Sequence, residues 1–239
     1  MSAPPTRMGP EPKKGTWENI IDKIQNTAVP IVVEFLRLLP DGLVFGVGLL
    51  SLLSFCKSYA VLLFTMFELM IIQRLFSSFI GSIAPTGAGI NANAAVCQNG
   101  FAFPNMMRIT MVDAVGSSNA FPSSTMFFLT GVVTYIIGTI QEFQREIVTL
   151  GGDVNMRTGA ATAFSVLFIL AMFIYRIVYG CDSFGNILLT VILGIIMGIA
   201  LVYQNTALFG RDGVNMLNIP MIITAAEAGK PMYVCAPSS

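Results

Sequence analysis

The sequence predicts an all-α, polytopic membrane protein: a transmembrane bundle of about four spanning helices, preceded by an amphipathic helix at the membrane interface. Of its 239 residues, 54% are hydrophobic and only 11% are charged, whereas a soluble domain carries about 25% charged residues. The apolar residues also gather in four long stretches with at most one charge each. A helix needs about 20 such residues to cross a hydrocarbon core about 30 Å thick. Lipid admits only segments that satisfy their own backbone hydrogen bonds, so these stretches are expected to be helices.

The first expected element is an amphipathic helix near the N-terminus. Residues 1–15 are rich in Pro, Lys and Gly, which is typical of an extended arm. Thr16 suits an N-cap, and the apolar residues that follow recur at helical spacing: Trp17, Ile20, Ile21, Ile24 and Ala28. A helix led by Trp suits the membrane interface, and a soluble helix packed on a partner protein is the alternative. Pro30 and Pro40 are expected to kink or break this segment.

The apolar stretches at 43–67, 124–140, 159–175 and 184–203 are the expected spans. The first is either part of one long helix, from about Gly42 to Phe79, or a hairpin of two short spans turning at Lys57. With one helix, nine Lys and Arg residues lie on one side of the membrane and three on the other. With a hairpin, the two sides hold four and eight of these residues. Positive charge favours the cytoplasmic side, so we expect four spans with both termini cytoplasmic.

This arrangement divides the chain into three parts. Residues 1–41 form the N-terminal arm and amphipathic helix, 42–203 the transmembrane domain, and 204–239 a C-terminal tail. Within the transmembrane domain, residues 81–122 form a long non-cytoplasmic loop. Small residues repeat in the expected spans, at Gly42 and Gly46, at Gly194 and Gly198, and at Gly131, Thr134 and Gly138, a pattern that favours close helix packing in lipid.

Several classes of function and site are not expected. The net charge is zero, so no nucleic-acid partner is expected. The chain contains no His, the residue most used as an acid–base group and as a metal ligand, and its four cysteines show no CxxC spacing. We therefore expect no metal, no cofactor and no catalytic residues. Cys97 in the long loop and Cys181 in the turn 177–184 share one side of the membrane and pair if that side is lumenal; two unpaired cysteines are the alternative.

Four ionisable residues fall in or near the spans: Lys57, Glu68, Arg74 and Arg176. Charge at membrane depth indicates function by default, and a transporter or channel would use Lys57 and Glu68. We expect instead that Glu68, Arg74 and Arg176 lie near helix ends, where such side chains reach the interface. Arg176 is also expected to form a local ion pair with Asp182.

Two stretches resemble signatures of the type-2 phosphatidate phosphatase superfamily. FPSSTMFFLTGVVTYIIG at 121–138 resembles the second signature, Pro-Ser-Gly-His at the start of a spanning helix. YRIVYGCDSFGNILLTVILGIIMG at 175–198 resembles the third, Ser-Arg followed after five residues by His and after three more by Asp. The resemblance covers about 45 residues and implies a non-cytoplasmic site where two helices begin.

The resemblance departs from the family at the reactive positions. Pro122, Ser123 and Arg176 match, which implies a relic anion-binding site at Ser123 and Arg176. Ser124 stands in the place of the Gly and Thr125 in that of the acid His; Asp182 replaces the nucleophilic His and Asn186 its orienting Asp. The first signature has only Arg108 as a counterpart, with Phe101 and Ile109 at its other places. An enzyme of this family is therefore not expected, although a lipid phosphate phosphatase-like activity is an alternative.

The layout of the chain, from its Pro-rich start to its GKPMYVCAPSS ending, also resembles inner-membrane and minor capsid proteins of large icosahedral DNA viruses. That resemblance implies a structural protein of a virion inner membrane, derived from a host membrane. Its partners would be lipid and capsid or other membrane proteins, contacted through 1–41 and 204–239. The expected function is thus non-enzymatic anchoring of lipid to a protein shell.

Overall fold

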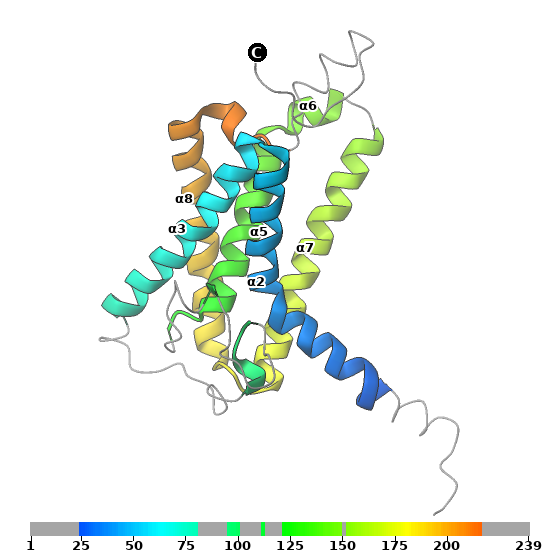
Figure 1. Cartoon of the computed structure of the whole chain (residues 1–239), viewed down its shortest axis with the longest axis vertical. Coiled ribbons are helices and arrows are strands. Elements are labelled where there is room, and N and C mark those ends of the chain that lie inside the picture. Colours follow the sequence, from blue (N-terminus) through cyan, green and yellow to red (C-terminus); the bar gives the residue numbers. More distant parts are fainter. Residues whose placement is uncertain (1–23, 81–94, 101–110, 113–120, 150–151, 217–239) are drawn as a thin grey trace, which may run out of the picture. The chain divides into compact units, whose positions relative to one another are not determined.

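The computed structural model describes residues 24–80, 95–100, 111–112, 121–149 and 152–216, and these contain helices and no β-strand. The all-α prediction is confirmed. The elements in chain order (Figure 1) are the π-helix η1 (Ile24–Ala28), α2 (Val29–Ser54), α3 (Lys57–Ile80), the 3-10 helix η2 (Ala95–Cys97), α5 (Ser124–Glu142), α6 (Gln144–Thr149), α7 (Gly152–Val178) and α8 (Phe184–Gly213).

Five helical segments are long and apolar enough to cross a membrane, one more than expected. They are Asn26–Ser54, Lys57–Ile80, Ser124–Glu142, Thr158–Val178 and Phe184–Gly213. Helices of this length and composition fit an integral membrane protein. We placed both termini on the same side of the membrane because we expected four spans. The described residues hold five helices of spanning length, so the sides of the termini stay a prediction.

The first apolar stretch accounts for the additional helix. We favoured one helix from Gly42 to Phe79, but α2 ends at Ser54 and α3 begins at Lys57. Phe55 between them has φ +51°, a left-handed conformation that ends an α-helix. The hairpin alternative is closer to the structure, although its first helix is not short, because α2 starts at Val29 and continues through Pro40.

The chain divides into two compact units, residues 1–36 and 37–239, with the boundary inside α2. In the first unit the described residues are η1 and the first turns of α2, which expose Ile31, Val32 and Phe35. The expected amphipathic helix lies mostly outside the described residues. In the second unit α8 extends to Gly213, beyond residue 203, where the expected transmembrane domain ends.

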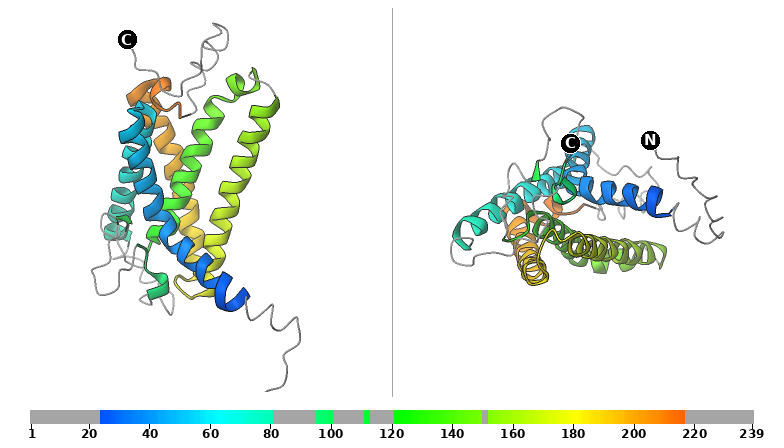
Figure 2. Two further views of the ribbon diagram at one scale, coloured as in Figure 1. Left: turned by 45° about the vertical axis from the view of Figure 1, so that its right-hand side comes forward. Right: turned by 90° about the horizontal axis from the view of Figure 1, so that it is seen from below.

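The core of the second unit is the contact of α5 with α8, with α3 and α7 also packed on α5 (Figures 1 and 2). The small residues allow this close approach. A Cβ atom added to Gly198 would lie 2.7 Å from the backbone oxygen of Gly131, and one added to Gly194 would lie 3.1 Å from that of Phe127. Gly42 and Gly46 have open space instead, with nothing within 4 Å of an added Cβ.

Asp41 joins α2 to the segment between α3 and α5. Its Oδ1 atom accepts hydrogen bonds from the backbone N–H groups of Met111, at 2.8 Å, and Val112, at 2.9 Å. We assigned residue 41 and loop 81–122 to opposite sides of the membrane, and the structure puts them in direct contact. The break at Phe55 adds one helix between Asp41 and this segment, which the assignment of sides did not include.

Candidate functional site

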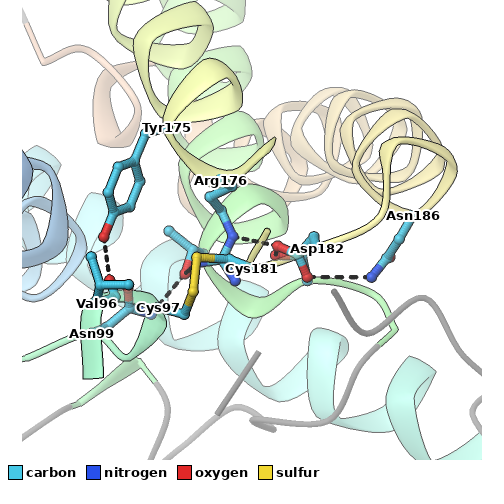
Figure 3. Close-up of a disulfide and its surroundings, with 10 residues drawn as sticks. Val96, Cys97, Asn99, Tyr175, Arg176, Cys181, Asp182 and Asn186 are labelled. Carbon is cyan, nitrogen blue, oxygen red and sulfur yellow. Dashed lines mark hydrogen bonds and ion pairs between the residues drawn. A yellow bond between two sulfur atoms is a disulfide. The ribbon is translucent and has the colours of Figure 1, made fainter. Parts of the chain in front are cut away.

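A buried polar cluster lies where α7 ends and α5 and α8 begin. Ser123 immediately precedes α5, Arg176 lies in the last turn of α7, Asp182 is in the turn between α7 and α8, and Asn186 is in the first turn of α8. Figure 3 shows Arg176, Asp182 and Asn186 pointing toward one another from these elements. All four side chains are buried, with at most 8% of each residue exposed.

The Asp182 carboxylate is the centre of this cluster. Its Oδ2 atom accepts a hydrogen bond from Ser123 Oγ at 2.9 Å and pairs with the Arg176 Nε–H group. Its Oδ1 atom accepts a longer bond of 3.4 Å from Asn186 Nδ2. A buried ion pair offsets the loss of hydration only where further hydrogen bonds satisfy the charged atoms, and Ser123 and Asn186 supply them here.

Thr125 extends the cluster toward the segment after η2. Its Oγ1 atom accepts hydrogen bonds from Arg176 Nη1, at 3.1 Å, and from Asn99 Nδ2, at 2.7 Å. Thr125 is fully buried. The Arg176 guanidinium therefore bridges the turn before α8 and the first turn of α5.

Thr190 closes the cluster on the α8 side. It donates to Asn186 Oδ1 at 3.1 Å and accepts from the Ser123 backbone N–H group at 3.2 Å. Nearby, Gln73 of α3 donates from Nε2 to the backbone oxygen of Pro122 at 2.8 Å. The start of α5 is thus held by both α3 and α8.

A disulfide between Cys97 and Cys181 lies beside the cluster (Figure 3), with Cα atoms 5.3 Å apart. It joins η2 to the turn between α7 and α8, across 84 residues of sequence. The Tyr175 hydroxyl group donates to the backbone oxygen of Val96, a second tie between the same two segments. These contacts fix the segment after η2 against the end of α7, which places Asn99 within reach of Thr125.

The structure brings together most residues singled out in the sequence. Arg176 and Asp182 form the expected ion pair, and Cys97 and Cys181 form the disulfide set out as one of two alternatives. Ser123 and Arg176, the expected relic anion site, do converge, but both donate to Asp182. Arg108 and Phe101, the counterparts of the first phosphatase signature, lie outside the described residues.

Three members of the cluster were missed in the sequence: Gln73, Asn99 and Thr190. Gln73 and Thr190 each interrupt an apolar stretch, and a polar side chain inside a span is a signal for a buried partner. Thr190 also follows Asn186 by one helical turn, the spacing at which side chains on a helix meet. Asn99 carried no such signal, because its segment has no periodicity.

Lys57 and Glu68 do not form a joint site. The Lys57 Nζ atom donates to the backbone oxygen of Phe209 at 3.2 Å, while Glu68 Oε1 accepts from Gln204 Nε2 at 2.7 Å. Glu68 was expected near a helix end, and this is wrong because α3 runs from Lys57 to Ile80. Its carboxyl group lies halfway along the helix.

Within the described ranges, no group of three or more His, Cys, Asp or Glu residues is placed to hold a metal ion. Comparison of the chain with protein-family models, curated proteins and solved structures finds no match. Function is therefore inferred from the geometry of the cluster itself.

Proposed function

We propose that the chain is a non-enzymatic integral membrane protein with a structural, anchoring role, and that the cluster around Asp182 locks its membrane helices together. One observation carries the proposal. Arg176 and Ser123, which would hold a phosphate group in the family that the sequence resembles, both donate to the chain's own Asp182 carboxylate. An internal anion therefore takes the place of a bound one.

The chemistry of the cluster is consistent with this role. A phosphate approaching Arg176 would meet the negative charge of Asp182 at the position of the family's nucleophile. Thr125 cannot supply a proton to a leaving group near neutral pH, and the chain has no His to act as nucleophile or acid. What the residues do supply is a buried, hydrogen-bonded connection among α5, α7, α8 and the segment after η2.

The positions of the disulfide-bonded cysteines support a setting outside the reducing cytosol. Cys181 precedes the first residue of α8, and Cys56, which is also disulfide-bonded, lies next to Lys57, whose Nζ atom contacts Phe209 near the other end of α8. Phe209 follows Phe184 by 25 positions, which is roughly 38 Å of helix. Whichever end faces the cytosol, where thiols stay reduced, a disulfide lies there.

A virion inner membrane derived from a host membrane fits this requirement, since a released particle leaves the cytosol, and it agrees with the layout of the chain. Lipid and capsid or other membrane proteins would then be the partners. Within the expected contact segments 1–41 and 204–239, Asp41 and Asn205 are buried in the second unit, so we propose the contacts for the ends of these segments. Their remaining parts, 1–23 and 217–239, lie outside the described residues.

A phosphatase assay separates the structural role from the enzymatic alternative. The purified full-length chain, reconstituted in liposomes that contain phosphatidate, is expected to release no more phosphate than its Arg176→Ala variant. Release that is well above background and disappears in Arg176→Ala would overturn the proposal.

Cross-linking in the native membrane tests the anchoring role. Deletion of residues 1–23 or of 217–239 leaves every described helix intact, whereas deletion of 1–41 would remove part of α2. We expect one of the two deletions to abolish cross-links to a neighbouring shell protein. Unchanged cross-links in both variants would count against anchoring through the ends of the chain.

A further inference from the structure

A second polar group lies in the middle of the membrane helices, away from the Asp182 cluster. Glu68 is eleven residues after the first residue of α3 and twelve before the last, so about 16 Å and 18 Å of helix separate it from the two ends. An ionisable side chain at this depth indicates a function by default. Neither the Asp182 cluster nor the proposed anchoring role makes use of it.

Hydrogen bonds from α8 fix the position of Glu68. Gln204 Nε2 donates to Glu68 Oε1 at 2.7 Å. The next residue, Asn205, donates from Nδ2 to the Oγ1 atom of Thr65, which lies about one turn before Glu68 on α3, at 2.7 Å. Asn205 Nδ2 also lies 3.4 Å from the Tyr135 hydroxyl group of α5. The polar group is therefore shared by the three helices α3, α5 and α8, seen side by side in Figures 1 and 2.

Two acceptor atoms in this group are buried without a hydrogen-bond partner among the described residues: Glu68 Oε2 and Asn205 Oδ1. The orientation of the Asn205 amide is fixed by its neighbours. Thr65 donates its own hydrogen to the backbone oxygen of Val61 at 2.8 Å, so the Asn205 atom facing Thr65 must be a donor. The amide oxygen of Asn205, a fully buried residue, consequently faces away from Thr65.

This pattern matches a protonated carboxyl group better than an ionised one. A carboxylate has about four lone-pair sites to satisfy, whereas a carboxylic acid has one O–H donor and a carbonyl oxygen that accepts. Glu68 has one oxygen that accepts from Gln204 and one that accepts from nothing described. Glu68 as a whole is partly buried, but its Oε2 atom is buried without a donor, and a charge left unpaired in an apolar setting is costly enough that the group takes up a proton instead. A proton on Oε2 also turns one of the two unpaired acceptors into a donor.

Among the residues that the structure describes, the charged groups around Glu68 do not provide an alternative partner. On α3 itself, Arg74 and Lys57 are six and eleven residues away, about 9 Å and 16 Å along the helix, and Lys57 contacts Phe209. From α5, Tyr135 is the titratable side chain that joins this group, through the 3.4 Å contact of its hydroxyl group with Asn205 Nδ2. From α8, the groups that meet this part of α3 are the neutral amides of Gln204 and Asn205.

We infer that Glu68, with Gln204 and Asn205, forms a proton-binding site at the middle of the membrane, in which the carboxyl group is held neutral at neutral pH. The ligand is a proton rather than a divalent metal ion, because a single carboxyl group contributes to the site. Binding of the proton lets α3 pack on α8 without a charge in the lipid, and its release places a negative charge at the contact of the two helices.

Dicyclohexylcarbodiimide, an apolar reagent that modifies protonated carboxyl groups within membranes, tests the inference on the unaltered full-length chain in liposomes. At neutral pH we expect modification of Glu68, measured by mass spectrometry of its peptide, and loss of that modification as the pH is raised. Glu142, an exposed carboxylate paired with Arg211, is the matched control and is expected to stay unmodified. Modification of Glu142 and not of Glu68 would overturn the inference.

Infrared spectra of the chain and of Glu68→Gln give a readout that is independent of reagent access. The wild-type protein should show the C=O stretch of a buried carboxylic acid at neutral pH, and Glu68→Gln should lose it, while Glu142→Gln retains it. A melting temperature that rises with sodium concentration in the wild type and not in Glu68→Gln would show that the site binds a metal cation, and would refute the proposal that it binds a proton. Absence of the acid band in the wild type would refute it as well.

Discussion

Removal of the Asp182 carboxylate is the perturbation to which the structure assigns the largest local effect. Asp182→Ala removes the charge that pairs with the Arg176 guanidinium. The Arg176 side chain is only 9% exposed, so water does not replace that partner. It also takes the acceptor away from Ser123 Oγ and Asn186 Nδ2. Breaking a buried ion pair by removing one partner costs about 3–5 kcal/mol, and we expect the free energy of unfolding to fall by about that amount.

The double variant Arg176→Met/Asp182→Val separates a lost pair from an uncompensated charge. Apolar residues of similar volume often replace a buried ion pair at little cost. The double variant should therefore lose less stability than Asp182→Ala, and less than the sum of the single variants Arg176→Met and Asp182→Val. The expected coupling lies in the range of about 0.5–3 kcal/mol seen for residues in contact.

Reversible unfolding by dodecyl sulfate in mixed micelles, followed by circular dichroism, measures these free energies. Glu142→Ala is the control, because its ion pair with Arg211 is exposed and has an N–O distance of 3.7 Å, so its loss should cost less than about 1 kcal/mol. An Asp182→Ala variant within about 0.5 kcal/mol of the wild type, the usual range for surface changes, would refute the reasoning. Strict additivity of the two single variants would refute it too.

Three further predictions use the same unfolding measurement or hydrogen exchange. Gly198→Leu should destabilise the chain by about 1–3 kcal/mol through overpacking, because a Cβ atom there meets the Gly131 backbone oxygen at 2.7 Å. Gly46→Ala is the control: its Cβ enters open space, and the free energy of unfolding should rise by up to about 1 kcal/mol. Equal effects of the two substitutions would contradict the packing. Cys97→Ser removes the cross-link to Cys181 and should cost about 2–5 kcal/mol; an unchanged midpoint under non-reducing conditions would speak against the disulfide. Asp41→Leu leaves the N–H groups of Met111 and Val112 without their acceptor, so both amides should exchange faster with solvent, and unaltered protection would show that Asp41 does not hold this segment.

The number of membrane helices shows where a sequence pattern stops being sufficient. The apolar stretches were correctly read as helices, because their lengths match a bilayer and lipid excludes unpaired backbone. The break near Phe55 was considered only as a hairpin turning at Lys57 and was not favoured, since a single Lys in LSFCKSYA does not by itself end a helix. Its signal is a backbone conformation, φ +51°. Positive-inside counting assumed one helix across this stretch, so the assignment of membrane sides stays a prediction.

The candidate site shows the complementary case. Ser123, Thr125, Arg176, Asp182 and Asn186 were selected because their spacing resembles a family signature, and the structure brings all five together. The chemistry could not be read from spacing, since the same residues suit an anion site or a closed network. Asp182 accepts from both Ser123 and Arg176, which is the contact that supports the closed network proposed above.

By itself the sequence determined that this chain is helical and suited to a membrane, because hydrophobicity and its distribution act locally along the chain. It also determined the chemical types of the cluster residues and the lack of His. Only the tertiary structure decided where α2 ends, which residues complete the cluster, and that Glu68 lies halfway along α3 with one oxygen that has no donor among the described residues. These depend on contacts between residues such as Thr65 and Asn205, 140 positions apart, and no local pattern encodes contacts of that range.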